Sequence, residues 1–399
     1  MTGDVDVAMH SSALRGKHIA LGITGGIAAT EAVRLCRELR RHGAQITVLM
    51  TTAACKVITP LAVGWASQGP VITEWKSDMS QLEQYDAILV APATRNFISR
   101  YVHGMMDHPL LMACSAARSR NAPIMIVPSM HNDLYDDPVT TDLLSKLEYP
   151  AEAITGPFEE GRYKQPNPVK IVADLCHIVN RDENSRHIAV TLGANRAPID
   201  AVRAIQNASS GKTGWAICEH LHRHGHFVTA IAGKTSADPS FDLPAVVRAG
   251  SPDEMLEACL ELAGRIESTL HVGPPDGWVH AAAVLDYIPN EIEGKKASGD
   301  AEWKLVLNPG PKHIQELSEM TKNTIRIGFK LETKVSIETL HERSLKQIET
   351  YGVDATIANL MEEMNDEQNP RAYIVTKDGI TPLENMNSVC ESILSVLTR

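Results

Sequence analysis

Short apolar runs alternate with segments of helical periodicity along both halves of the chain. The run at residues 18–23 ends in a glycine turn, apolar positions then recur at helical spacing, and a second run covers residues 45–50. This order predicts a strand, a helix and a second, parallel strand. Runs at residues 87–91 and 124–127 predict two further strands, and the same alternation resumes at residue 187. The pattern therefore predicts an α/β protein with two doubly wound, Rossmann-like domains.

Polar segments indicate where these domains begin and end. Residues 177–186 are charged and lack periodicity, which is typical of a linker. The first 16 residues carry acids and histidines without an apolar signal segment, so we expect a disordered tail there. The expected domains are then residues 17–176 and residues 187–399.

Composition narrows the class of ligand. The chain carries 49 acidic and 38 basic residues and a net charge of -11, so nucleic acid is not an expected partner. Its seven cysteines are scattered without a CxxC pair, which favours buried, reduced thiols over a metal site. No apolar segment approaches the roughly 20 residues of a membrane span. We therefore expect a cytoplasmic protein whose ligands are small molecules.

Tight turns follow the predicted strands of the first half. The turn Thr24-Gly25-Gly26 differs from the GxGxxG fingerprint of dinucleotide sites. Proline-containing loops follow the next strands, at the sheet edge where open α/β sheets bind ligands. Either these loops bind a phosphate-bearing ligand simpler than a dinucleotide, or the turns serve only the topology.

A second candidate site covers residues 207–214, between a predicted strand and a predicted helix. Ser209, Ser210 and Gly211 offer hydroxyls and accessible backbone amides, and Lys212 adds a positive charge beside the helix amino terminus. This segment, which we call the cradle, indicates a phosphate site, or else only a helix cap.

A carboxylate and two lysines lie further along the second half. Asp286 follows a predicted strand, and Lys295 and Lys296 occupy a loop next to a glycine. A carboxylate near lysines suits a nucleoside triphosphate with a divalent cation. The alternatives are a helix cap for Asp286 and a solvated charge pair for the two lysines.

Several motifs of the first half match a known family in order. They are Thr24-Gly-Gly-Ile-Ala-Ala, Met50-Thr-Thr-Ala-Ala54, Ala91-Pro-Ala-Thr-Arg-Asn96 and the Pro128-Ser-Met turn. On these motifs, residues 17–175 resemble the flavin-dependent cysteine decarboxylase family. The resemblance implies a flavodoxin-like domain that binds FMN, if the site is retained, at the matching positions Thr24, Gly25, Gly26, Thr51, Thr94 and Asn96.

Three positions depart from the chemistry of that family. The segment Asp78–Leu82 lacks the family's essential histidine, His131 stands where the family has a catalytic Asn, and Thr155 stands where it has a reducing Cys. A threonine hydroxyl cannot replace a thiol acid, because its pKa lies far above the ~8.5 of a free Cys. We expect that this half has lost decarboxylation. The alternative is another flavin or ligand-binding use, with His131 as a new acid or base.

The second half resembles another family, the phosphopantothenate–cysteine ligases, over residues 187–399. The matching motifs are Ile199-Asp-Ala-Val-Arg203, the cradle, Ala281-Ala-Ala-Val-Leu-Asp-Tyr287 and Gly328-Phe-Lys-Leu-Glu-Thr333. The resemblance implies that a nucleoside triphosphate activates the carboxylate of phosphopantothenate as an acyl-nucleotide, and that the amine of cysteine then displaces the nucleotide. CTP is expected over ATP, because the two-domain fusion is the bacterial arrangement. A homo-oligomer is also expected.

The ligase resemblance assigns roles to individual residues. It implies catalytic roles for Asn207, Lys295 and Lys296, a Mg²⁺ ligand at Asp286, a substrate contact at Asn359, and nucleotide or phosphate contacts at Ser209, Ser210, Gly211, Lys212, Asp286, Phe329 and Lys330. Three hypotheses remain open. They are a ligase with an inactive decarboxylase-like half, a fully bifunctional decarboxylase and ligase, and a diverged flavin- or nucleotide-binding protein of regulation or secondary metabolism.

Overall fold

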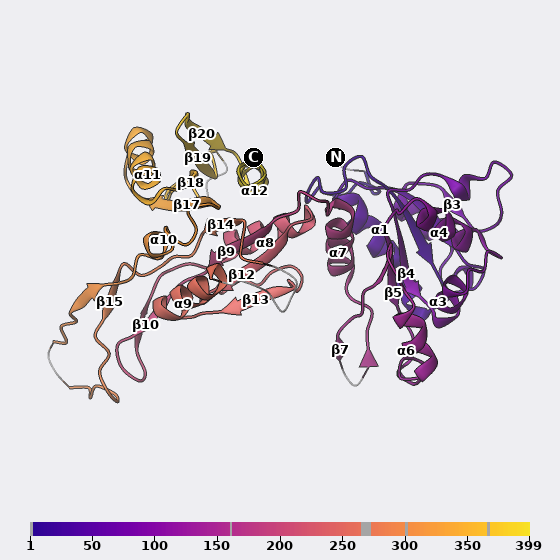
Figure 1. The fold of residues 1–399 in the computed structure, drawn as a ribbon, viewed down its shortest axis with the longest axis horizontal. Coiled ribbons are helices and arrows are strands. Elements are labelled where there is room, and N and C mark those ends of the chain that lie inside the picture. The colour runs from indigo at the N-terminus through magenta and orange to yellow at the C-terminus, as the bar shows by residue number, and fades with distance from the viewer. Residues whose placement is uncertain (1–2, 160–161, 265–272, 300–301, 365–367) are drawn as a thin grey trace. The chain divides into compact units, whose positions relative to one another are not determined.

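The computed structural model describes residues 3–159, 162–264, 273–299, 302–364 and 368–399. The chain forms two compact units (Figure 1). The first comprises Met1–Arg181 with Arg223–Gly225, and the second comprises Asp182–His222 with His226–Arg399. Both are α/β units, as the alternation of apolar runs predicted.

The first unit contains a six-stranded parallel sheet in the order β3-β2-β1-β4-β5-β6. Its strands are β1 (His18–Ile23), β2 (Gln45–Met50), β3 (Val71–Ile72), β4 (Ala87–Ala93), β5 (Ile124–Pro128) and β6 (Ala151–Ala153). Its helices are α1 (Ala32–Arg41), α2 (Pro60–Ser67), α3 (Arg95–Val102), α4 (Pro109–Ser119), α5 (Asn132–Tyr135), α6 (Pro138–Ser145) and α7 (Pro168–Asn180). A hairpin of β7 (Phe158–Glu159) and β8 (Arg162–Tyr163) precedes α7.

Burial on both faces explains why these strands read as continuous apolar runs. Leu21 and Leu89 belong to one hydrophobic cluster, whereas Ala20 and Ile88, the preceding residues on the same strands, belong to another. Successive residues of a strand point to opposite faces, so helices must cover both faces of the sheet.

The amino-terminal segment differs from the predicted tail. Leu14 is fully buried in the first unit, and its backbone N–H donates to the carbonyl of His42 over 2.8 Å. The boundary between the two units falls between Arg181 and Asp182, inside the predicted linker, although α7 continues to Asn180. Local polarity misled the prediction at the amino terminus, since a few apolar residues inside a polar segment suffice to attach it to a core.

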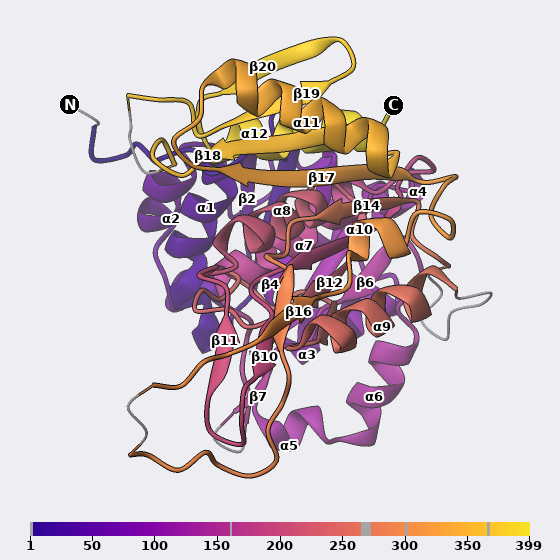
Figure 2. The ribbon, with the colours of Figure 1, turned by 90° about the vertical axis from the view of Figure 1, so that its left-hand side faces the viewer.

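The second unit contains an eight-stranded sheet in the order β13-β12-β9-β14-β17-β18-β19-β20. Its strands are β9 (His187–Leu192), β12 (Phe227–Ala232), β13 (Ala245–Arg248), β14 (Gly277–His280), β17 (Ile325–Glu332), β18 (Ala355–Leu360), β19 (Ala372–Thr376) and β20 (Gly379–Leu383). Figure 2 shows β17 as a long strand between β14 and β18. The sheet is mixed, because β19 pairs antiparallel with both β18 and β20. The expectation of a parallel sheet is therefore wrong for β19, which a short turn joins to β20 without a crossover helix.

Two antiparallel ribbons extend from the second sheet (Figures 1 and 2). They are β10 (Arg196–Pro198) with β11 (Ala204–Gln206), and β15 (Tyr287–Pro289) with β16 (Leu307–Pro309). The helices of this unit are α8 (Lys212–Arg223), α9 (Pro252–Ala263), α10 (His313–Glu316), α11 (Ile337–Tyr351) and α12 (Met386–Leu397). Each ribbon follows the carboxyl end of a central strand, so both lie where the sequence placed its candidate residues.

Candidate functional site

The backbone carbonyl of Ala283 joins three segments of the second unit. Strand β9 pairs with β12 on one side and with β14 on the other, so the chain changes direction here and ligands are expected at this edge. The Ala283 carbonyl accepts the backbone N–H of Asn195 over 3.2 Å and the side-chain Nδ2 of Asn207 over 2.9 Å. The predicted catalytic Asn207 is therefore held by the Ala281–Tyr287 motif, 76 residues away in the sequence.

The cradle between Asn207 and α8 is tightly packed. Gly211 has a φ of +79°, and a Cβ on it would lie 2.5 Å from Cγ2 of Thr235, so no larger residue fits without strain. The hydroxyls of Ser209 and Ser210 accept the backbone N–H groups of Gly211 and Lys212 over 3.4 and 3.3 Å. The hydroxyls thus cap the helix start, and the same hydroxyls and N–H groups are those that a phosphate would contact.

Arg371 connects the cradle helix to the predicted substrate residue Asn359. Its guanidinium donates to Oγ1 of Thr213, in the first turn of α8, over 3.1 Å and to Oδ1 of Asn359 over 3.3 Å. Asn359 is the last residue but one of β18 and is 8% exposed. Arg371 was not predicted from the sequence, and spacing could not have found it, because it lies 158 residues from Thr213.

Asp200 anchors the loop that carries the two predicted lysines. Its buried carboxylate accepts the backbone N–H of Val202, of Arg203 and of Lys296, the last over 3.2 Å, and the Arg203 guanidinium over 2.6 Å. Burial alone would raise the pKa of Asp200, but these hydrogen bonds outweigh it and lower the pKa to about 2. Lys295 is exposed and Lys296 half-buried. The sequence contained the signal, since Asp200 lies in a matched motif, but its role was not assigned.

Asp286, the predicted metal ligand, forms an ion pair with Lys312. Oδ1 of this exposed carboxylate lies 2.6 Å from Nζ of Lys312, and the hydrogen bond raises the pKa of Lys312. An exposed carboxylate oxygen suits a hard cation such as Mg²⁺, and the lysine supplies positive charge at the same oxygen. A divalent cation at Asp286 would therefore have to displace Lys312, a residue that was not predicted from the sequence.

Phe329 and Lys330 lie towards the carboxyl end of β17, next to the β18 strand that carries Asn359. Nζ of Lys330 lies 3.3 Å from the carboxylate of Glu332, and the carbonyl of Phe329 accepts Nε2 of Gln347 over 3.3 Å. The parallel pairing of β17 and β18 thus brings these three predicted residues to one edge of the sheet.

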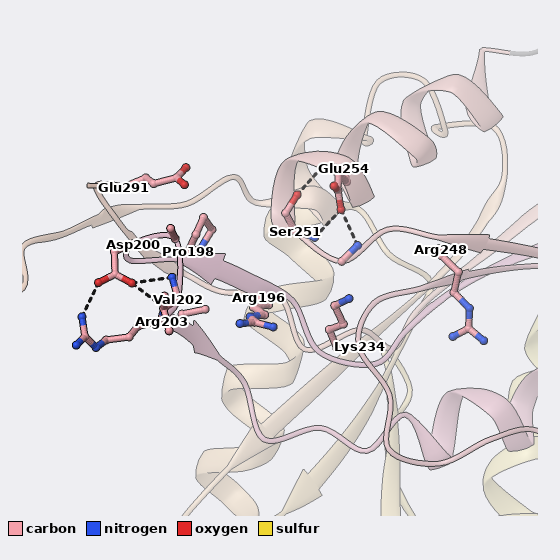
Figure 3. Close-up of a pocket in the computed structure, with 13 residues that line it drawn as sticks. Arg196, Pro198, Asp200, Val202, Arg203, Lys234, Arg248, Ser251, Glu254 and Glu291 are labelled. Atoms are coloured by element: carbon pink, nitrogen blue, oxygen red, sulfur yellow. Dashed lines mark hydrogen bonds and ion pairs between the residues drawn. The ribbon is translucent and has the colours of Figure 1, made fainter. Parts of the chain in front are cut away.

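A cavity of about 510 Å³ lies beside the β10–β11 ribbon (Figure 3). Arg196, Lys234 and Arg248 line it. The carboxylate of Glu254, which also lines it, accepts the backbone N–H groups of Gly250 and Ser251 over 2.8 and 3.0 Å as part of a capping box. Arg203 adds a fourth basic side chain, and Asp200, Glu254 and Glu291 add three acidic ones, so basic groups exceed acidic groups in the lining by one. The sequence did not predict it, since the cations come from three separate segments.

The predicted FMN positions lie at the carboxyl ends of β1, β2 and β4. The Thr24 hydroxyl donates to the carbonyl of Pro92 over 2.8 Å and accepts the N–H of Thr94 over 2.9 Å. Oγ1 of Thr51 accepts the N–H of Ala54 over 3.2 Å, and a Cβ on Gly25 would lie 2.4 Å from Cβ of Ala53.

Gly26 approaches Thr94, because a Cβ on this glycine would lie 3.6 Å from Thr94 Cγ2. Asn96 is exposed in the first turn of α3. The bare glycine backbone fits the close approach of a phosphate, whereas the hydroxyls of Thr24 and Thr51 already bond within the protein.

The altered decarboxylase positions are both exposed. His131 caps α5 and lies 3.3 Å from the carboxylate of Asp133. Thr155 lies in the segment between β6 and β7. Nearby, Tyr163 of the hairpin donates its backbone N–H to Oδ1 of Asn132 over 3.1 Å, and its ring stacks on Tyr135 with centroids 4.3 Å apart. His131 is thus an exposed helix cap beside a carboxylate.

Sequence comparison defines the class of each half. Residues 7–180 match the Flavoprotein family, and residues 184–399 match the DNA/pantothenate metabolism flavoprotein C-terminal domain. The chain is 37% identical to the coenzyme A biosynthesis bifunctional protein CoaBC of Thermococcus kodakarensis, covering 95% of this chain and 94% of that protein. It is 31% identical to the CoaBC protein of Haemophilus influenzae, covering 87% of each. The chain belongs to this family of bifunctional coenzyme A biosynthesis proteins, which confirms the resemblance found in its motifs.

Solved structures also match. The DNA/pantothenate metabolism flavoprotein from Streptococcus pneumoniae has 24% identity and a TM-score of 0.46, covering 53% of this chain and 97% of that chain. Among the residues that the structure describes, no helix is long and apolar enough to cross a membrane.

Proposed function

We propose that the second unit is a phosphopantothenate–cysteine ligase that forms an amide through an acyl-nucleotide, with CTP favoured over ATP. The observation that carries this proposal is the Ala283 carbonyl, which accepts the backbone N–H of Asn195 and the side chain of Asn207 beyond the carboxyl ends of the paired strands β9 and β14. Membership of a coenzyme A biosynthesis family supports the choice of phosphopantothenate and cysteine as substrates.

In the first step, a carboxylate oxygen of phosphopantothenate attacks the α-phosphorus of CTP, and pyrophosphate leaves. Two anions must approach each other, so the site has to supply positive charge. Lys295 and Lys296, on the loop anchored by Asp200, would provide it. Asp286 would hold Mg²⁺, which neutralises charge on the triphosphate when bound. Ser209, Ser210 and the α8 amino terminus would bind a phosphate.

In the second step, the amine of cysteine attacks the acyl carbon, the acyl–oxygen bond breaks and CMP leaves with release of one proton. Asn207 orients the acyl group through its amide without bringing charge. Phe329 and Lys330 contact the nucleotide, and Asn359, held by Arg371, contacts the substrate. The cavity beside the β10–β11 ribbon, which has Arg196 and Lys234 in its lining, would receive a negatively charged end of a substrate.

The first unit, in this proposal, binds FMN at its glycine turn and no longer decarboxylates. The exposed Thr155 and the helix-capping His131 support the loss of chemistry, since neither can supply a thiol acid. A second candidate is a fully bifunctional enzyme. The match of residues 7–180 to the Flavoprotein family favours it, as does the bifunctional description of the relatives.

A pyrophosphate assay tests the ligase proposal. The purified chain is incubated with CTP and ATP in parallel, with and without phosphopantothenate and cysteine. Repeated turnover of pyrophosphate that requires both phosphopantothenate and cysteine supports the proposal, since phosphopantothenate alone should release at most one pyrophosphate per site. No release with either nucleotide contradicts it. Asn207→Ala should abolish amide formation, while Thr155→Ala should leave it intact.

Two further measurements on the same sample separate the candidates for the first unit. A visible absorbance scan tests for bound flavin. CO₂ released from phosphopantothenoylcysteine and trapped would favour the bifunctional candidate. Bound flavin without CO₂ release would favour a first unit that binds FMN but does not decarboxylate.

A further inference from the structure

Two imidazoles and a carboxylate meet where α1 of the first unit ends. Glu38 lies in the last turn of α1, and His42 follows one turn later as its carboxyl cap. His10 arrives from the amino-terminal segment, where its backbone N–H donates to the carbonyl of Arg41 over 2.8 Å. One ligand atom from each of the three residues lies within 4.8 Å of the other two.

The spacing of these atoms suits a shared metal ion. Oε1 of Glu38 lies 3.3 Å from Nε2 of His42, longer than the roughly 2.9 Å of a typical N–H···O hydrogen bond. Two ligands at about 2.05 Å from a tetrahedral Zn²⁺ are separated by about 3.3 Å. His10 is exposed, so its ring can rotate to shorten the remaining distances.

Neighbouring side chains orient both buried ligands. Oγ of Ser11 lies 2.6 Å from Nδ1 of His42, and a hydroxyl there can accept the Nδ1–H and leave the Nε2 lone pair for a metal. The guanidinium of Arg41 lies 2.8 Å from Oε2 of Glu38, which leaves Oε1 facing His42. Metal-ligating histidines and carboxylates usually have such outer partners.

We propose that His10, Glu38 and His42 form a binding site for a divalent metal ion of the Zn²⁺ class, with one coordination position left for water. Two imidazoles and one carboxylate favour Zn²⁺ over Mg²⁺ or Ca²⁺, which prefer oxygen ligands. Arg41 and Arg223 face the cluster and oppose a cation, so moderate affinity is expected. A bound ion would attach the amino-terminal segment to α1, independently of the ligase chemistry.

The test uses the full chain after treatment with a chelator and removal of the chelator. Calorimetric titration with Zn²⁺ should detect one ion bound at this site per chain. His10→Ala should lower the affinity for that ion at least tenfold. Because the side chain of His10 is exposed, this variant should fold, which circular dichroism can check. His103→Ala is the matched control, since His103 is an exposed histidine elsewhere in the first unit. This variant should bind Zn²⁺ with unchanged affinity.

Titration with Co²⁺ gives a second readout. A bound ion with nitrogen and oxygen ligands in tetrahedral geometry shows strong visible absorption, which should be lost in His10→Ala and in Glu38→Gln but not in His103→Ala. If the unsubstituted chain binds no Zn²⁺, or if His10→Ala binds Zn²⁺ as tightly as the unsubstituted chain does, the proposed site is wrong.

Discussion

Replacing His280 by Phe should make the second unit more resistant to mild acid. His280 ends β14, is 9% exposed, and stacks on Trp278 with ring centroids 6.1 Å apart. Burial, together with the nearby Arg326 and His313, lowers the pKa of His280 to about 3. Within the described residues, Nε2 of His280 has no hydrogen-bond partner, so a Phe ring replaces it without breaking one.

The sign and size of the effect follow from proton linkage. The unfolded chain protonates His280 near its ordinary pKa of about 6.5, whereas the folded unit does not until about pH 3. The unfolded state therefore binds more protons between these values, and stability is lost as the pH falls from about 6.5 towards 3. Between pH 7 and pH 5 this single group removes about 2 kcal/mol of unfolding free energy.

Hydrogen exchange of peptides from the second unit, measured across a urea series at pH 7 and pH 5, reports this free energy. The unsubstituted chain should lose about 2 kcal/mol more than His280→Phe between the two values. Trp278→Phe is the control, because it disturbs the same stack but keeps the titrating imidazole, so most of the loss between pH 7 and pH 5 should remain in it. Equal pH dependence in His280→Phe and the unsubstituted chain would refute the reasoning.

Three further substitutions test the site. Asp200→Asn should release the loop of Lys296 and lower kcat/KM for pyrophosphate release about tenfold. An unchanged kcat/KM would show that this loop takes no part in catalysis. Lys312→Met should remove the competitor at Asp286 and lower the Mg²⁺ concentration for half-maximal activity two- to fivefold, as expected for an exposed pair worth up to about 1 kcal/mol. Gly211→Ala should cost at least about 1–2 kcal/mol in urea unfolding of the second unit, because its φ is +79°, and unchanged stability would contradict that strain.

The amino-acid sequence by itself determined the central strands and the edge of each sheet that carries the candidate residues. Strands such as β1 and β4 are buried on both faces, so they must be apolar at nearly every position, and that signal is local. The cradle at the start of α8 could be predicted for a similar reason, because a helix start with Ser and Gly is a short-range pattern. The antiparallel pair β19 and β20 was not, since pairing direction depends on the connection rather than on the apolar pattern.

Only the tertiary structure decided which side chains meet within the second unit. Lys312 reaches Asp286, and Arg371 joins Asn359 to the first turn of α8, although Arg371 and Thr213 are 158 residues apart. The cavity beside the β10–β11 ribbon likewise collects side chains from separate segments, β10 and β13 among them. Such contacts depend on the order of strands in the sheet, which brings loop ends together at one edge. Residue spacing along the chain carries no record of that order, so the sequence predicted the chemistry of the site but not its pairings.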